Sequence, residues 1–530
     1  MGILLGNEAI VRGALESGVQ FVSTYPGTPA SEIGNTFFKL SQNGDFKGHF
    51  EFSTNEKVAL EAGIGASFSG LKTLVAMKSF GLNVCSDALL PFVYTGTKGP
   101  TVIVVADDPN CWSSAQSEQN SRAYSYLAHI PTLEPADPQE CRDFVKLAFE
   151  ISEKFKIPVM VRTTTRVSHQ KMPVQLGKPT RTVLVNGEFV KDSKKFVTMP
   201  PRVLEMKEEL LEKIRKIKDF SEKSSSNKFI GVKRLPFGII TSGVSYLYVM
   251  EALKELRLNL PVLKLGFFYP LPEKKIKKFT KNLKKVLIVE ELEPYLEKEV
   301  ERLVRSDLVE VVGKELIPEV GELKPEIVTS AIAKFTNKKF QIPDSRCQIP
   351  APKRRPQLCP GCPYWLVFGA VKKAVDPKKV IFGGDIGCYM LAGLPPHNIQ
   401  DYLSCMGSSV GIAHGIKKST NQKLITFIGD STFFHSGIPA LINTVFNKSN
   451  PLIIIMDNQT TAMTGHQPHP GAPTIPDGIK SEDIVSACGV KNLKVIDPAN
   501  QPEFIQTIKE FINKKEVSVI IARHPCVFVK

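Results

Sequence analysis

The chain has 530 residues, of which 42% are hydrophobic and 23% charged, as expected for a folded protein of about three domains. No apolar run approaches the ~18 residues of a membrane span, and the N-terminus lacks a secretory signal, so we expect a cytoplasmic protein without a membrane segment. The net charge of +15 suggests nucleic-acid binding. However, the lysines occur in pairs without interleaved aromatic residues, which favours a solvated surface and no nucleic-acid partner.

The first third of the chain, residues 1–165, alternates short apolar runs with helical patterns. Small residues at helical spacing in residues 55–66 favour close packing of a helix against a neighbouring element. Strands that alternate with helices predict a doubly wound parallel sheet, which belongs to the α/β class. The expected strands are residues 21–23, 51–53, 73–77, 101–106 and 158–162.

Glu56 stands at the start of this small-residue helix and has two interpretations. An acidic residue in the first turn of a helix often only stabilises the positive end of the helix dipole. A carboxyl group in this position can instead hydrogen-bond a heteroaromatic nitrogen of a cofactor and promote the tautomer that forms a carbanion. Both interpretations are compatible with the pattern.

The middle of the chain is expected to carry no catalytic residues. Residues 166–230 are a lysine- and glutamate-rich connector that ends in a serine-rich linker. Residues 231–340 return to the α/β pattern, and no residues there have catalytic spacing. The proline-rich residues 341–357 predict a second linker.

Residues 358–530 carry most of the expected site. One apolar run ends at Gly429-Asp430, and the next ends before Asn458, 28 residues after Asp430. Parallel strands bring their carboxyl ends to one edge of a sheet, where α/β proteins bind ligands. Asp430 and Asn458 would offer Mg²⁺ the hard oxygen ligands it prefers, while Gly429 and the following helix N-terminus favour a bound diphosphate. The alternative is a purely structural turn, because Gly-Asp pairs are common at strand ends.

Cys359 and Cys362 form the one closely spaced pair among ten cysteines. Most of the others are expected to be buried small hydrophobes, and no disulfide framework is expected without a secretory signal. A structural zinc site would need a second closely spaced pair. An iron–sulfur cluster takes four thiolates, so it is compatible with this pair and two single cysteines from elsewhere in the chain.

Several motifs together resemble one family, and the resemblance covers nearly the whole chain. They include TYPGTPASE (24–32), NEKVALEAGIGAS (55–67), LCPGCPYW (358–365) and, as the most specific, DNQTTAMTGHQPHP (457–470). By these motifs the chain resembles the α subunits of indolepyruvate:ferredoxin oxidoreductases, within the wider 2-oxoacid:ferredoxin oxidoreductase family.

The resemblance implies three domains of the thiamine-diphosphate-binding type. They are a pyrimidine-binding domain (1–165), a transketolase C-terminal-like domain (231–340) and a diphosphate-binding domain (358–530), with the cofactor between the first and the last. By motif, Glu56 would face the aminopyrimidine and Thr28 the 2-oxoacid. The Mg²⁺ ligands would be Asp430, Asn458 and the backbone carbonyl of Thr460. Residues near the diphosphate would be Gly387, Cys388, Gly429 and Ser431.

The resemblance also implies a redox reaction, the oxidative decarboxylation of an aryl 2-oxoacid to its coenzyme A thioester. Electrons would pass through a [4Fe-4S] cluster to ferredoxin. The cysteines at the family's cluster positions are Cys359, Cys362, Cys388 and Cys526. Two alternatives are a non-redox thiamine diphosphate decarboxylase or lyase, and a non-catalytic scaffold subunit.

Three departures from the family pattern bear on the partners and the substrate. Members usually continue into a ferredoxin-like domain, whereas this sequence ends at Lys530. We therefore expect a hetero-oligomer. Its other members would be a β subunit that carries the γ-type domain of the family, and ferredoxin or a ferredoxin-like subunit. Tyr364, Asn120 and His524 replace the histidine, acidic and basic residues of the family motifs, which leaves the substrate class and the cluster environment open.

Overall fold

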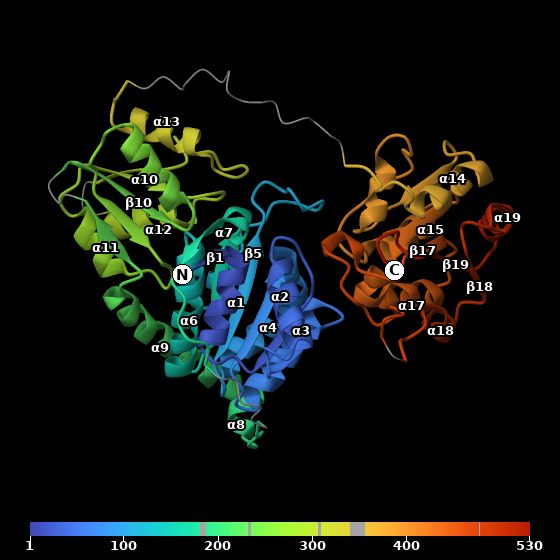
Figure 1. The fold of residues 1–530 in the computed structure, drawn as a ribbon, viewed down its shortest axis with the longest axis horizontal. Helices are drawn as coiled ribbons and strands as arrows, with labels where there is room; N and C mark the ends of the chain where they lie inside the picture. The colour runs from blue at the N-terminus through green and yellow to red at the C-terminus, as the bar shows by residue number, and fades with distance from the viewer. Residues whose placement is uncertain (181–186, 232–234, 306–308, 340–355, 476, 530) are drawn as a thin grey trace. The chain divides into compact units, whose positions relative to one another are not determined.

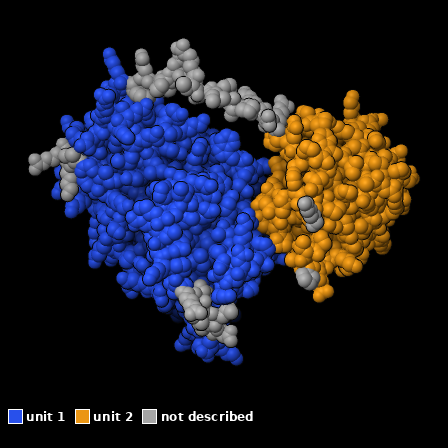
Figure 2. Space-filling model, viewed as in Figure 1, with its two compact units in different colours: residues 1–348 blue, residues 349–530 orange. Residues whose placement is uncertain are grey.

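The structure is a computed structural model that describes residues 1–180, 187–231, 235–305, 309–339, 356–475 and 477–529. The chain forms two compact units, residues 1–348 and residues 349–530, which are drawn in blue and orange in Figure 2. Among the described residues, no helix is both long and apolar enough to cross a membrane.

The larger sheet of unit 1 has seven strands in the order β12-β6-β7-β5-β4-β2-β3 (Figure 1). Its strands are parallel except β12, which pairs antiparallel with β6 at one edge. The three central strands β4, β5 and β7 are entirely buried, as expected for parallel strands covered on both faces. The bounds are β2 Phe21–Thr24, β3 His49–Phe52, β4 Thr73–Lys78, β5 Thr101–Asp107, β6 Thr132–Leu133, β7 Val159–Thr164 and β12 Phe267–Tyr269.

Helices connect these strands and pack against one another in pairs, α1 with α6 and α3 with α4. A short antiparallel pair, β1 (Gly2–Leu5) with β8 (Lys171–Val174), joins the start of the chain to the end of the sheet region. The helices of this region are α1 Gly6–Glu16, α2 Ser31–Gln42, α3 Glu56–Phe68, α4 Ser79–Thr95, α5 Ala123–Leu127, α6 Pro138–Phe155, α7 Thr165–His169, α8 Ser193–Phe196 and α9 Arg202–Lys223.

The second sheet of unit 1 has five strands in the order β14-β13-β10-β11-β9, with only β9 antiparallel to its neighbour. Its strands are β9 Lys228–Ile230, β10 Phe237–Ser242, β11 Val262–Leu265, β13 Lys285–Val289 and β14 Glu310–Val312. The helices that belong to it are α10 Ser245–Glu255, α11 Glu273–Thr280, α12 Tyr295–Val304 and α13 Pro325–Phe335.

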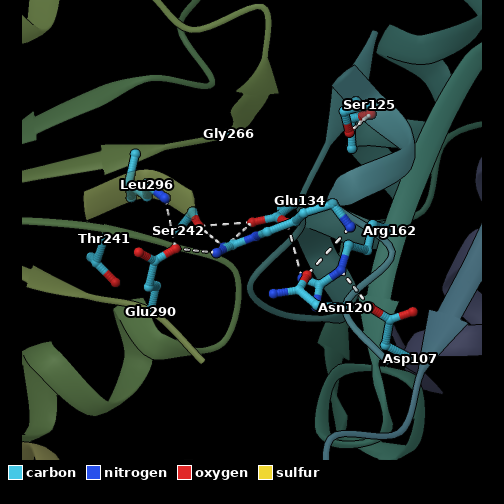
Figure 3. A network of polar contacts seen from close by, with 12 residues as sticks. Asp107, Asn120, Ser125, Glu134, Arg162, Thr241, Ser242, Gly266, Glu290 and Leu296 are labelled. Carbon is cyan, nitrogen blue, oxygen red and sulfur yellow. Dashed lines mark hydrogen bonds and ion pairs between the residues drawn. The ribbon is translucent and has the colours of Figure 1, made fainter. Parts of the chain in front are cut away.

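A buried network of ion pairs joins the two sheets of unit 1 (Figure 3). Arg122 contacts Glu134 beside the seven-stranded sheet at 2.7 Å and Glu290 at the end of β13 at 2.5 Å. Arg162, on β7, contacts Glu134 at 2.9 Å and Asp107 at 2.7 Å. Burial alone would raise the pKa of Glu134, but the two arginines lower it to about 2. The two sheets therefore share a set of charges that is neutralised only when both are in place.

Unit 2 is built on one fully parallel sheet in the order β15-β16-β17-β19-β18. Its strands are β15 Val380–Gly383, β16 Lys423–Gly429, β17 Leu452–Asp457, β18 Asn492–Ile496 and β19 Ser518–Arg523. Its helices are α14 Tyr364–Ala374, α15 Ser408–Ser419, α16 Asp430–Thr432, α17 Ile438–Phe446, α18 Ser481–Ala487 and α19 Gln501–Phe511. A π-helical turn, Phe433–Gly437, makes α16 and α17 one continuous helical segment.

The predicted α/β class with doubly wound parallel sheets is confirmed. The predicted serine-rich linker differs from expectation, because Ser226 and Asn227 are buried. The Asn227 side chain accepts hydrogen bonds from the N–H groups of Gly266 and Phe267, so this stretch is fixed against β12. Residues 341–355 of the second predicted linker lie outside the described residues, and the predicted domain bounds stay a prediction.

Candidate active site

The polar residues predicted at two strand ends of unit 2 lie on neighbouring strands. In the register of the parallel pair, Gly429 at the end of β16 lies opposite Met456 of β17. Asp430 and Asn458 therefore follow adjacent strands at the same edge of the sheet. Both side chains are buried, with 3% and 5% of their surface exposed. A buried carboxylate beside a buried amide at this edge requires polar partners.

The Asp430 carboxylate accepts hydrogen bonds on both oxygens. Its Oδ1 accepts from the backbone N–H of Ser431 at 2.7 Å, and its Oδ2 accepts from the backbone N–H of Gln459 at 2.8 Å. Gln459 has a φ of 66°, in the left-handed region that residues other than glycine rarely adopt. Such backbone strain is concentrated at functional sites, and here it turns an N–H group toward Asp430.

His469 is a third donor to Asp430, and the sequence analysis did not single it out. Its Nε2 lies 3.1 Å from Asp430 Oδ2, and its Nδ1 accepts from the N–H of Gly471 at 3.2 Å. Because Nδ1 is an acceptor, the ring proton is on Nε2 and is donated to Asp430. A carboxylate has about four lone-pair positions, so three hydrogen bonds leave room for one bond to a cation.

Asn458 and Thr460 place further oxygen atoms close to Asp430. Asn458 Oδ1 accepts from the N–H of Thr460 at 3.3 Å, and the Thr460 carbonyl accepts from Ala462 at 2.9 Å. Each of these oxygens keeps a second lone pair. One carboxylate, one amide and one carbonyl form an oxygen set that suits Mg²⁺.

Gly429 and Gly387 both border the ring of Tyr389. A Cβ on Gly429 would lie 2.7 Å from Tyr389 Cε1, and one on Gly387, which has a φ of 159°, would lie 2.3 Å from the same atom. The Tyr389 hydroxyl donates to the Ile386 carbonyl at 2.8 Å. Packing of this ring therefore requires glycine at both positions, in addition to the close approach of a diphosphate that was predicted.

The four cysteines predicted to bind a cluster lie near one another in unit 2. Burial, together with the neighbouring thiols of Cys362, Cys526 and Cys359, raises the pKa of Cys388 to about 11. Burial, together with Cys359 and Cys526, likewise raises the pKa of Cys362 to about 11. Each of these two thiols is influenced by Cys359 and Cys526, so the four cysteines lie in the same part of unit 2.

The backbone links these cysteines to the residues around Asp430. The N–H of Cys362 donates to the Cys359 carbonyl at 3.1 Å, which closes the turn before α14. A Cβ on Gly361 would lie 3.5 Å from a methyl group of Val527, so this turn lies against the C-terminal segment. The N–H of Cys526 donates to the Asn458 carbonyl at 3.1 Å. Within the described part of the chain, no three His, Cys, Asp or Glu side chains converge closely enough to bind one metal ion.

In unit 1, Thr28 and Glu56 lie at the carboxyl edge of the seven-stranded sheet. Thr28 belongs to the turn that follows β2, and Glu56 is the first residue of α3, after β3. The side chain of Asn55 caps this helix by accepting from the N–H of Val58 at 2.9 Å. Glu56 is 7% exposed, so it is not the solvated acid that the simpler interpretation assumed.

A cavity of about 560 Å³ lies elsewhere in unit 1, between α7 and α10. Its lining includes Trp112, Arg166, His169 and Tyr248 but neither Thr28 nor Glu56. Arg166 and His169 are each bound to a carboxylate, Glu322 at 2.8 Å and Glu32 at 3.4 Å. The predicted site residues therefore do not line this cavity.

Comparison with known families gives two matches along the chain. Residues 12–227 match the family described as pyruvate flavodoxin/ferredoxin oxidoreductase, thiamine diphosphate-binding. Residues 385–522 match the C-terminal thiamine pyrophosphate-binding domain of thiamine pyrophosphate enzymes. The second match contains Asp430, Asn458 and His469.

Comparison with individual proteins identifies relatives that match over nearly the whole chain. The indolepyruvate oxidoreductase subunit IorA of Methanothermobacter marburgensis is 44% identical over 99% of this chain and 86% of its own length. The subunit of the same name from Pyrococcus horikoshii is 42% identical over 99% of this chain and 85% of its own length. The fold also resembles a solved 2-oxoglutarate:ferredoxin oxidoreductase from Magnetococcus marinus, with 18% identity, a TM-score of 0.51, and coverage of 63% of this chain and 65% of that one.

Proposed function

Because the chain belongs to the family of indolepyruvate oxidoreductase subunits designated IorA, we propose that it catalyses the thiamine diphosphate-dependent oxidative decarboxylation of an aryl 2-oxoacid. The observation that carries the proposal is the hydrogen bonding of Asp430. Its carboxylate is buried, accepts three hydrogen bonds and keeps one lone pair beside the oxygens of Asn458 and Thr460. This arrangement suits Mg²⁺ and, through it, a diphosphate.

The predicted site residues of unit 2 have definite roles in this proposal. Asp430, Asn458 and the Thr460 carbonyl bind Mg²⁺, and Ser431, Gly429, Gly387 and Cys388 border the diphosphate. The helical segment that starts at Asp430 would present the positive end of its dipole to the anion. When bound, thiamine diphosphate supplies the carbanion and the electron sink that decarboxylation of a 2-oxoacid requires.

Unit 1 supplies the acid and the substrate contact. Glu56 holds a proton at the aminopyrimidine ring nitrogen, and its burial favours a short, directed hydrogen bond to that nitrogen. Thr28 lies in the turn after β2 and contacts the 2-oxoacid. The proximity of both residues to the carboxyl edge of a parallel sheet supports these roles, because α/β sheets bind ligands there.

The four neighbouring cysteines, Cys359, Cys362, Cys388 and Cys526, would bind a [4Fe-4S] cluster. Such a cluster takes four thiolates, and these four cysteines lie in the same part of unit 2. The hydrogen bond from the N–H of Cys526 to the carbonyl of Asn458 joins the segment after β19 to one of the proposed Mg²⁺ ligands. Held by these cysteines, a cluster would supply one-electron transfer toward ferredoxin, with coenzyme A as the acyl acceptor.

The natural form of the enzyme in this proposal is a complex. The relatives are named as subunits of indolepyruvate oxidoreductases, which supports a β subunit as the partner of this chain. A ferredoxin or ferredoxin-like subunit would accept the electrons. The excess of positive charge on the chain suits an acidic electron carrier.

The first experiment compares two glutamates of the same helix in the anaerobically purified complex. Glu56→Gln removes the proposed acid, whereas Glu61→Gln changes an exposed residue one turn further along α3. We expect Glu56→Gln to lower 2-oxoacid-dependent dye reduction by about 100-fold or more, as loss of general acid–base catalysis does. Near-normal activity of this variant would contradict the assignment.

The second experiment separates the redox proposal from its two alternatives. Iron and acid-labile sulfide are measured in the complex and in the variants Cys359→Ser and Cys526→Ser. The control is Cys488→Ser, at the C-cap of α18. We expect loss of iron and sulfide from the first two variants only. Bound thiamine diphosphate without iron would favour the non-redox decarboxylase or lyase, and absence of both would favour the scaffold.

A further inference from the structure

Lys78 is a buried lysine at the carboxyl edge of the seven-stranded sheet, and it has no role in the function proposed so far. It is the last residue of β4, the strand between β2 and β5. Only 9% of its surface is exposed. The turn that contains Thr28 follows β2, and Asp107 ends β5. Lys78 therefore lies at the edge where both the substrate turn and Glu56 are located.

Direct contacts connect Lys78 to the Thr28 turn. Its Nζ donates to the Ser113 carbonyl at 2.9 Å and to Ser113 Oγ at 3.3 Å. Ser113 Oγ in turn lies 3.0 Å from the Thr28 carbonyl. A Cβ on Gly27 would lie 2.9 Å from Lys78 Cβ, so the turn rests directly on the lysine. One serine thus separates the ammonium group from the residue proposed to contact the 2-oxoacid.

The charge of Lys78 is not neutralised by a direct ion pair with any residue that the structure describes. Asp108 attracts the Lys78 ammonium group without contacting it. The Asp108 carboxylate instead accepts hydrogen bonds from Ser113, Ser114 and Thr165. Burial lowers the pKa of Lys78 to about 8, against the attraction of Asp108 and Cys111. A buried ammonium group without a bound anion is energetically unfavourable, and an anionic ligand would relieve this.

The start of α4 adds a second feature that favours an anion at the same place. Lys78 is the residue before this helix of 17 residues, whose first N–H groups and dipole attract negative charge. Gly81, in the first turn of α4, lies against the carboxyl group of Glu56. The ammonium group and the proposed acid thus border the same helical turn.

We propose that Lys78 binds the carboxylate of the 2-oxoacid substrate. The inference rests on the proposed function and extends it, because it assigns recognition of the acid group to this chain. An ammonium group has three N–H donors, and the two oxygens of Ser113 use two of them. The Nζ also lies 5.4 Å from the ring centroid of Phe80, a cation–π contact that leaves the third donor for the substrate carboxylate, next to Thr28.

The reaction itself determines which kinetic parameter Lys78 controls. The carboxylate leaves as CO₂, so its negative charge is largest in the bound substrate and decreases toward the transition state. An ion pair to this group therefore stabilises the bound substrate at least as much as the transition state. Loss of the ion pair should raise KM and leave kcat nearly unchanged.

The test uses the anaerobic complex with Lys78→Met, Lys78→Arg and a matched control, Lys72→Met. Lys72 directly precedes β4 at its opposite end, and its Nζ also donates to a backbone carbonyl, that of Ser17, at 3.0 Å. KM and kcat are measured with phenylpyruvate and indolepyruvate. Calorimetry measures binding of 3-phenylpropanoate and of the neutral 3-phenylpropanamide.

We expect Lys78→Met to raise KM and weaken 3-phenylpropanoate binding by about 10- to 100-fold, the loss of one charged hydrogen bond. Binding of the amide should change less than twofold, Lys78→Arg should restore part of the affinity, and Lys72→Met should match the parent. Equal weakening of acid and amide, or an unchanged KM, would overturn the proposal. A complex that binds 3-phenylpropanoate through Lys78 but reduces no dye with any 2-oxoacid would overturn the proposed function alone.

Discussion

The side chain of Glu56 lies so close to Gly81 that a Cβ on Gly81 would be 2.5 Å from Glu56 Cγ and 2.9 Å from Oε1. Glu56 begins α3 and Gly81 lies in the first turn of α4, and these two helices pack together. The direction of the proposed acid thus depends on the absence of a side chain at Gly81.

Gly81→Ala is therefore expected to displace Glu56 and lower activity by about tenfold or more, since overpacking typically costs about 1–3 kcal/mol. The control is Gly65→Ala in α3, where a Cβ would meet nothing within 4 Å. That change should leave activity intact and stabilise the helix by about 0.5–1 kcal/mol. The measurements are dye reduction and Tm. Equal activity of the two variants would show that the position of Glu56 is not critical.

His469 is expected to set the Mg²⁺ affinity of unit 2, because it donates a hydrogen bond to Asp430. Loss of a residue that orients a metal ligand typically weakens metal binding by about 10- to 100-fold. His469→Ala should show this loss in calorimetric titration of Mg²⁺ with thiamine diphosphate present. His466→Ala, an exposed histidine three residues earlier, is the control. Unchanged affinity in His469→Ala would exclude this orienting role.

The strands and their polar ends could be predicted because they depend on local pattern. The apolar runs before Asp430 and Asn458 have strand length, and parallel strands bring their ends together. The sequence indicated Glu56 as a candidate residue. Its burial could not be predicted, because it depends on the contact with Gly81 in another helix. The proximity of Cys359, Cys362, Cys388 and Cys526 followed only from the family resemblance, since no periodicity relates them.

The residues that the sequence did not reveal act through partners distant in the chain. His469 contacts Asp430 from 39 residues away, and Lys78 contacts Ser113 from 35 residues away. Neither of these separations along the sequence corresponds to the period of a helix or a strand. The serine-rich linker was misjudged for the same reason. Its composition is that of a flexible segment, but Asn227 hydrogen-bonds Gly266 and Phe267 about 40 residues later.

Substrate binding should depend on the protonation of Lys78. Its pKa of about 8 means that the free site is charged at pH 7 and loses the charge as pH rises through 8. The affinity for 3-phenylpropanoate should therefore fall about tenfold per pH unit above pH 8, whereas Lys78→Arg should bind without this fall. The other titratable groups that act on Lys78 are Asp108 and Cys111. A similar fall in Lys78→Arg would assign the dependence to Cys111.

The stability of unit 1 should fall with rising pH because of Glu291, which follows β13 close to the ion-pair network. Burial raises its pKa from 4.5 to about 7, although Leu323 donates a hydrogen bond to Oε1 at 3.0 Å. The folded state then binds more protons than the unfolded state between pH 4.5 and 7, so the free energy of unfolding decreases across this range, by about 3 kcal/mol at most. Glu291→Gln keeps the acceptor for Leu323 and removes the charge. It should raise Tm at pH 8 and leave Tm at pH 4.5 nearly unchanged, whereas the exposed control Glu293→Gln should do neither. An unaltered pH dependence of Tm in Glu291→Gln would show that Glu291 is ionised in the folded protein throughout this range.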